Sequence, residues 1–149
     1  MRLAYTSVAM VIAIVTSLFS TALTAEEKRV GDYVIYYNAF NSTFLQPNIA
    51  NSYKIPRSGT TGVINVAVHR HNPTNTPDPI KANIQGRAKN NLSQYEDLAF
   101  REIREDNAIY YLADFQFRPE ENTELTFNIR LPGEANPIEL KLDQKFHKE

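Results

Sequence analysis

The chain has 149 residues, of which 16 are lysine or arginine and 17 are aspartate or glutamate, so its formal net charge is −1. A near-neutral chain has no basic footprint, and this argues against nucleic acid or an anionic membrane surface as a partner. The chain contains no cysteine. Its absence excludes disulfides, thiol nucleophiles, cysteine metal sites and the lipid-bearing cysteine of an anchored exported protein.

The first 25 residues predict a secretory signal peptide. Arg2 is their only charge, an apolar run follows over residues 8–19, and small and hydroxylated residues close the segment. This run is shorter than the roughly 20 apolar residues that a membrane span requires. We expect cleavage after Ala25, so that the mature chain begins at Glu26. Cleavage after Ala22 is the alternative, and it fits the small-residue rule well, because it places Ser20 at the −3 position where cleavage after Ala25 places the larger Leu23.

Removal of residues 1–25 leaves residues 26–149, a length that suits one domain. The removed segment holds one arginine and no acid, so the mature chain carries 15 basic and 17 acidic residues and a net charge of −2. The expected product is an exported protein with no lipid anchor and no membrane span after cleavage.

Seven segments of the remaining chain are predicted to form β-strands. In chain order they cover residues 33–37, 63–68, 80–88, 98–103, 109–117, 125–131 and 138–142. The third, sixth and seventh alternate apolar and polar residues, as strands with one solvated face do. The first, second and fifth are apolar or aromatic on both faces, which is typical of central strands or of a face that meets a partner.

A short helix is predicted over residues 46–55. Ile49 and Tyr53 are spaced four apart, Pro47 suits the first helical position, and Pro56 follows the end. About seven short strands separated by turn residues indicate a mostly β fold, an antiparallel β-sandwich of immunoglobulin-like type. A small closed β-barrel is the alternative.

Several segments together resemble a known family. They are residues 31–45, 47–53, 57–58, 62–68 and 109–113, with Gln144 and Phe146 near the end. In this order they are similar to the exported proteobacterial proteins of the family of domain of unknown function 4426. The resemblance implies a Gram-negative source and a periplasmic location. It implies no activity, cofactor or catalytic residue.

His69 and His71 are the candidate metal ligands. Two histidines at alternate positions of a strand share a face, and imidazole suits copper and zinc. A stable site requires a third or fourth ligand, for which His147, Asp78 and Asp114 are the available residues. The alternative is a pair of histidines at a strand end with no metal role.

The tyrosines at positions 33, 36, 37, 110 and 111 are the candidate binding aromatics. Most of them are expected in the core, because aromatic residues favour strands and fill sandwich interiors. Five cannot easily all point inward, so an exposed aromatic patch that includes Tyr36 and Tyr110 is the leading binding site.

Asn41, Ser42 and Thr43 could form a polar ligand-binding site, the predicted polar cradle. In it, the guanidinium of Arg57 would bind an acidic group of the ligand through two hydrogen bonds. The alternative is turn chemistry, in which these side chains bond backbone where a strand gives way to a helix. We expect turn chemistry.

No catalytic motif is present: the sequence has no G-x-S-x-G elbow, no H-E-x-x-H helix and no phosphate-binding glycine loop. The sequence therefore predicts a non-catalytic binding or accessory module of the cell envelope. Its partner is expected to be an envelope protein or component, and no cofactor is expected. The alternative function is copper or zinc handling through His69 and His71.

Overall fold

The computed structural model describes residues 25–74 and 76–149, so residues 1–24 of the predicted signal peptide, with the alternative cut after Ala22, fall outside the described residues. Within them the chain forms strands, one 3-10 turn and one short helix. These are β1 (Glu26–Val30), β2 (Tyr33–Asn41), η2 (Ser42–Phe44), α2 (Pro47–Ser52), β3 (Thr61–Arg70), β4 (Asn83–Lys89), β5 (Tyr95–Leu98), β6 (Arg101–Glu105), β7 (Ala108–Gln116), β8 (Asn122–Arg130) and β9 (Ile138–Lys145).

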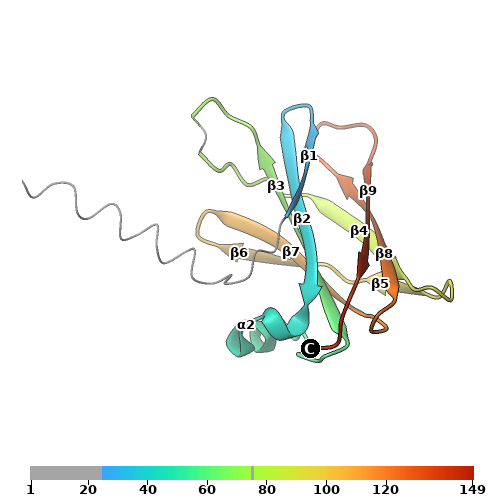
Figure 1. The fold of residues 1–149 in the computed structure, drawn as a ribbon. Helices are drawn as coiled ribbons and strands as arrows, with labels where there is room; N and C mark the ends of the chain where they lie inside the picture. The colour runs from blue at the N-terminus through green and yellow to red at the C-terminus, as the bar shows by residue number, and fades with distance from the viewer. Residues whose placement is uncertain (1–24, 75) are drawn as a thin grey trace, which may run out of the picture.

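The strands form two antiparallel sheets that pack face to face (Figure 1). The five-stranded sheet has the order β1-β2-β3-β7-β6, and the four-stranded sheet has the order β5-β4-β8-β9. The edge strands of the first sheet, β1 and β6, do not pair with the edge strands of the second, β5 and β9, so the two sheets stay separate. The predicted β-sandwich is therefore confirmed, and the alternative of a closed barrel is wrong.

The topology is that of an immunoglobulin-like sandwich. When β1 and β5 are set aside, seven strands remain in the chain order β2, β3, β4, β6, β7, β8 and β9. Of these, β2-β3-β7-β6 form one sheet and β4-β8-β9 form the other, which is the A-B-E-D and C-F-G arrangement of that fold. The added strand β1 joins the edge of β2 through a two-residue turn at Gly31, whose φ of 55° favours glycine. The sequence pattern did not predict β1, because its residues EEKRV are mostly charged and exposed.

The predicted strand over residues 98–103 is wrong in one respect. The chain changes sheets within it: β5 ends at Leu98 in the four-stranded sheet, and β6 begins at Arg101 in the five-stranded one. Leu98 is buried in the main core, whereas Ile103 is buried in a second cluster on the outer side of the five-stranded sheet. No glycine or proline marks the crossing, so the residue pattern gives no sign of it.

The main core lies between the sheets and is built from alternate residues of the strands. Phe115, Phe127 and Phe146 are its largest fully buried side chains. Phe117 stacks on Phe146 with ring centroids 5.0 Å apart, and Phe115 meets the same ring edge to face at 5.4 Å. Burial of one large apolar side chain contributes about 1.5–3 kcal/mol. This core provides the stability that disulfides give to many small exported domains.

The helix α2 begins at Pro47, as predicted, and ends at Ser52, three residues before the predicted end. The segment that contains it covers one end of the outer face of the five-stranded sheet. Ile55 packs there in the second cluster with residues of β2, β3, β6 and β7, namely Phe40, Val63, Ile103 and Leu112. The backbone of the C-terminal residue Glu149 lies close to Gly59, in the loop between α2 and β3.

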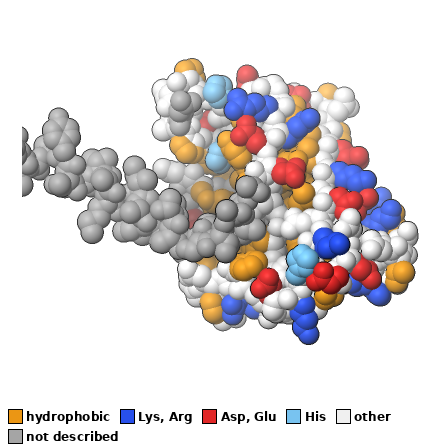
Figure 2. All heavy atoms as spheres, viewed as in Figure 1, with side chains coloured by type: hydrophobic (Ala, Val, Ile, Leu, Met, Phe, Trp, Pro, Cys, Tyr) orange, Lys and Arg blue, Asp and Glu red, His pale blue; other side chains and the backbone are white. Residues whose placement is uncertain are grey.

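Two further properties of the described residues bear on function. None of their helices has the length and apolar character needed to cross a membrane. On the face drawn in Figure 2, basic and acidic side chains are interspersed rather than gathered into an area of one sign. This distribution agrees with the near-neutral composition.

Candidate functional site

Strand alternation divides the five tyrosines between the two sides of the five-stranded sheet. Tyr33, Tyr37 and Tyr111 point into the sandwich and are at most 7% exposed. Tyr36 and Tyr110 are on the outer face, where Tyr36 is half-buried and Tyr110 is 37% exposed. Because neighbouring residues in a strand face opposite sides, the pairs 36–37 and 110–111 each supply one core ring and one surface ring.

Hydrogen bonds hold the three inward tyrosines in place. The Tyr33 hydroxyl donates to the carbonyl of Pro132 at 2.8 Å, and the Tyr37 hydroxyl donates to Glu26 at 3.0 Å. The Tyr111 hydroxyl accepts a hydrogen bond from the Ala82 backbone amide at 2.8 Å. Burial raises the pKa of both Tyr37 and Tyr111. These rings are therefore part of the core, whereas Tyr36 and Tyr110 lie on the outer face.

Tyr36 and Tyr110 flank Ala67 on the outer face. Tyr36 of β2 pairs directly with Ala67 of β3. Val66 of β3 pairs with Tyr111 of β7, so Tyr110 lies one position further, on the other side of Ala67. Neighbouring strands are about 4.8 Å apart, so the two tyrosines stand about 10 Å apart with only a methyl group between them. We call Tyr36, Ala67 and Tyr110 the aromatic row.

His69 borders the aromatic row on one side. Its ring meets that of Tyr36 edge to face, with centroids 5.4 Å apart. The loop after β3 turns back here, so that Pro79 forms a bridge with His69 and the Asp78 carbonyl accepts the Arg70 backbone amide at 2.8 Å. Burial lowers the pKa of His69, and the carboxylate of Asp78 opposes this shift. The imidazole therefore favours its neutral form.

Two asparagines border the aromatic row on the other side. Asn38 of β2 pairs directly with Asn65 of β3, and both are half-buried. The Asn65 Oδ1 is buried and accepts no hydrogen bond within the described part of the chain. Amide side chains both donate and accept, so this pair adds hydrogen-bonding groups beside the aromatic row.

The metal candidates do not come together. His71 is exposed beyond the end of β3, whereas His69 is half-buried against Tyr36. Two of the residues considered as further ligands are paired elsewhere: His147 contacts Glu120 at 2.7 Å, and Asp114 accepts from Arg101 at 2.8 Å. Within residues 25–74 and 76–149, no group of three or more histidine, aspartate or glutamate side chains is close enough to hold a metal ion.

Asn41, Ser42 and Arg57 of the predicted polar cradle bond backbone groups, whereas the buried Thr43 hydroxyl has no hydrogen-bond partner among the described residues. Asn41 is 5% exposed, and its Nδ2 donates to the carbonyl of His147 at 2.7 Å, which ties the C-terminal segment to β2. The Ser42 hydroxyl accepts from the backbone amide of Ser58 at 3.0 Å. Arg57 is exposed and donates to the Thr43 carbonyl at 2.9 Å. These contacts join the loops around α2.

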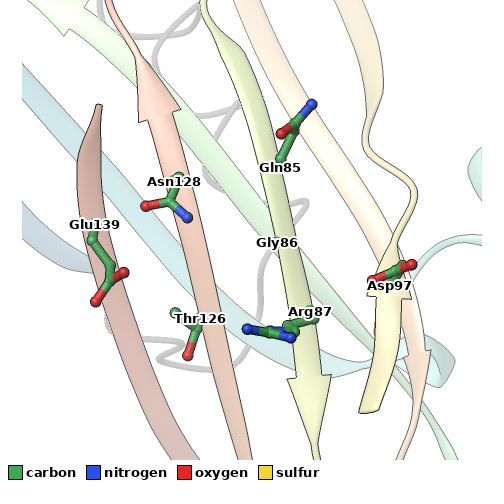
Figure 3. Close-up of a pocket in the computed structure, with 7 residues that line it drawn as sticks. All are labelled: Gln85, Gly86, Arg87, Asp97, Thr126, Asn128 and Glu139. Carbon is green, nitrogen blue, oxygen red and sulfur yellow. The ribbon is translucent and has the colours of Figure 1, made fainter. Parts of the chain in front are cut away.

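Sequence reasoning missed a shallow hollow on the outer face of the four-stranded sheet (Figure 3). Its volume is about 230 Å³. It is lined by Gln85, Gly86, Arg87, Asp97, Thr126, Asn128 and Glu139, and we call it the polar hollow. These residues occupy the polar positions of alternating strands, which predict only a solvated face. They meet through cross-strand register, which the sequence does not reveal.

Comparisons with known proteins identify relatives of unknown function. The model of the DUF4426 family, described as a domain of unknown function, matches residues 27–149. The crystal structure of a DUF4426 family protein from Pseudomonas aeruginosa PAO1 is 32% identical, with a TM-score of 0.72 over 84% of this chain and 96% of that chain. No curated protein matches this chain.

Two structures of FetP from uropathogenic Escherichia coli strain F11 are also similar. One is the protein as isolated after recombinant expression in the periplasm, with a TM-score of 0.59 over 83% of this chain and 94% of that chain. The other is a copper-bound variant, with a TM-score of 0.60 over 83% and 95%. Both are 12% identical to this chain, so the likeness shows the fold alone.

Proposed function

This chain belongs to the DUF4426 family, and we propose that it is a non-catalytic periplasmic module that docks a protein of the cell envelope on the outer face of its five-stranded sheet. The predicted signal peptide at residues 1–25 and the absence of cysteine support an exported protein without a lipid anchor. The similarity in fold to FetP, which was expressed in the periplasm, agrees with this location.

The aromatic row carries the proposal. Tyr36 and Tyr110 face away from the core, although the other tyrosines of the same sheet, Tyr33, Tyr37 and Tyr111, lie inside. Tyrosine combines a large apolar body with one hydrogen-bonding tip, and it is enriched among the residues that dominate binding energy at protein interfaces. Ala67 lies between the two rings and is only 6% exposed, so the row presents its two tyrosines rather than the alanine to a partner.

The surroundings of the row also fit a protein interface. Asn38 and Asn65 supply hydrogen-bonding groups on one side, and the half-buried His69 borders the other. Protein interfaces commonly join an aromatic centre to polar groups, with charged residues depleted from the centre. Ile103, which pairs with Tyr110, continues the apolar character toward the edge strand β6.

The histidine contacts support a non-catalytic role. His69 meets an aromatic ring, and His147 contacts Glu120 at the surface. Neither imidazole has a serine or threonine hydroxyl among its hydrogen-bond partners in the described residues. A nucleophile requires an adjacent base within hydrogen-bonding reach, and these contacts do not supply that pair.

A quantitative pull-down tests the proposal. The tagged protein is used to capture envelope proteins, and the yield is compared for wild type, the Tyr36→Ser and Tyr110→Ser double variant, and Tyr95→Ser. Tyr95 is the matched control, because it is 57% exposed and lies on the other sheet. We expect the double variant to lower the yield of a specific partner by about tenfold or more. Equal yields for the double variant and wild type would contradict the proposal.

A further inference from the structure

The polar hollow is a second candidate site, on the sheet opposite the aromatic row. Two cross-strand rows meet in it. One runs from Asp97 through Arg87 to Thr126, and the other runs from Gln85 through Asn128 to Glu139. These side chains come from β5, β4, β8 and β9, and Arg87 and Thr126 lie side by side in Figure 3.

A short residue between longer neighbours explains the depression. Thr126 pairs with Arg87 on one side and with Lys141 on the other. The Nζ of Lys141 forms an ion pair with the Oε2 of Glu124 at 2.7 Å, so this side chain is directed away from Thr126. The space above Thr126 therefore stays open, although it is surrounded by side chains long enough to fill it.

The side chains that line the hollow make no hydrogen bond or ion pair with another described residue. They are Gln85, Arg87, Asp97, Thr126, Asn128 and Glu139. Some charged residues elsewhere on the sheets are paired, such as Glu124 with Lys141 and Asp114 with Arg101. The hollow therefore concentrates unused donors and acceptors in one place.

Arg87 keeps its donors free because an aromatic ring holds it. Its guanidinium carbon lies 4.7 Å from the centroid of Tyr95, while its direct cross-strand neighbour Asp97 forms no ion pair with it. A guanidinium that stacks on a ring keeps its N–H edge available for planar, two-point contacts. The Tyr95 ring is 57% exposed and does not itself line the hollow, but it packs on Arg87, which does.

We propose that the polar hollow binds a neutral saccharide. Hydroxyl groups donate and accept hydrogen bonds, which matches a surface where amides, a guanidinium, a hydroxyl and carboxylates alternate. The hollow has no apolar wall for an apolar ligand. Arg87 is opposed by Asp97 and Glu139, so neither an anion nor a cation meets a surface of one sign. Tyr95 supplies an apolar surface for the less polar side of a sugar ring.

The size of the hollow sets the expected affinity. A volume of about 230 Å³ on an open sheet is below the roughly 300–1,000 Å³ of typical ligand pockets, and holds one sugar ring with one side in solvent. Incomplete burial limits the free energy of binding, so the dissociation constant is expected near 1 mM.

An NMR titration of the isotope-labelled protein tests the inference. The probes are chitotriose and maltotriose as neutral saccharides, and inorganic phosphate as a small anion. We expect a saccharide to shift the backbone amide signals of residues 85–87 and 126–128. We also expect Asn128→Ala to raise the dissociation constant about tenfold, as the loss of a two-point amide contact does. Asn122→Ala is the matched control, since it removes the same side chain from an exposed position of the same strand.

The outcomes separate this inference from the docking proposal. The Tyr36→Ser and Tyr110→Ser double variant should bind the saccharide like wild type, because its substitutions lie on the other sheet. The absence of shifts with both saccharides up to about 20 mM, well above the expected dissociation constant, would overturn the inference. Shifts confined to residues outside β4, β5, β8 and β9, or a response to phosphate alone, would also overturn it.

Discussion

The rings of Tyr36 and His69 meet edge to face on the outer side of the five-stranded sheet, with centroids 5.4 Å apart and planes inclined by 63°. They come from neighbouring strands, where Val34 pairs with His69 and Tyr36 pairs with Ala67. The contact therefore joins adjacent rows of the sheet. It holds one ring of the aromatic row in place and partly removes an imidazole from water.

The position of His69 predicts a pH dependence of stability. Burial lowers the pKa of its imidazole in the folded protein. The unfolded chain therefore binds a proton at higher pH than the folded chain does, and unfolding takes up protons. The free energy of unfolding is expected to decrease as the pH falls through about 6.5, the pKa of an unperturbed histidine. Urea unfolding between pH 7.5 and 5.5 measures this change.

Two variants assign the pH dependence to His69. His69→Gln should flatten the decrease, because the titrating group is gone. His71→Gln, at an exposed position beyond the end of the same strand, should keep the wild-type slope. If the free energy of unfolding fell equally with pH in wild type and His69→Gln, the burial of His69 would not be the cause of the pH dependence.

Asn41 is predicted to stabilise the fold. Asn41→Ala removes the hydrogen bond to the carbonyl of His147 from a side chain that is 5% exposed. Leaving a buried partner unsatisfied costs about 1–3 kcal/mol. Arg57→Ala removes an exposed bond to the Thr43 carbonyl and should change stability by at most about 0.5 kcal/mol. Chemical denaturation gives both values, and equal effects for the two variants would contradict this assignment.

Gly86 is predicted to be required where β4 approaches β8. It pairs directly with Phe127, and a Cβ at Gly86 would lie 2.6 Å from the carbonyl oxygen of Thr126 and 2.7 Å from the Cβ of Phe127. Because one of these atoms belongs to the backbone, Gly86→Ala should destabilise the protein by about 1–3 kcal/mol. Gln85→Ala on the same strand is the control. A Gly86→Ala variant as stable as wild type would refute the close approach.

A metal titration tests the alternative function. His69 and His71 differ in burial, and Asp114 and His147 are paired with other residues. We therefore expect the affinity of the purified protein for copper(II) and zinc, measured by competition with a chelator, to be unchanged in the His69→Ala and His71→Ala double variant. A fall of about tenfold or more in the double variant would establish metal handling through these histidines.

The alternation of residues predicted much of the fold. The strict pattern over residues 125–131 lies almost entirely within β8, and Pro47 marked the first residue of α2. The crossing between Leu98 and Arg101 was not predictable, because apolar residues on both sides of it look like one strand. The edge strand β1 was missed because its charged residues depend on pairing with β2 rather than on burial.

The candidate sites were only partly predictable. Successive residues of a strand face opposite sides, so in each of the pairs 36–37 and 110–111 one tyrosine must face outward. This much follows from the sequence. That Tyr36 and Tyr110 flank the same alanine depends on the register of three strands. The polar hollow depends on the register of four strands, so its residues are scattered in the sequence and carry no motif.

Site-specific photo-crosslinking tests the docking face most directly. A photoreactive residue is placed in turn at Tyr110, at Tyr36 and, as a control on the other sheet, at Tyr95, and the cells are irradiated. We predict one discrete adduct with an envelope protein from the first two positions and none from Tyr95. Adducts from Tyr95 alone, or no adduct from Tyr110 and Tyr36, would contradict the assignment of the aromatic row as the binding surface.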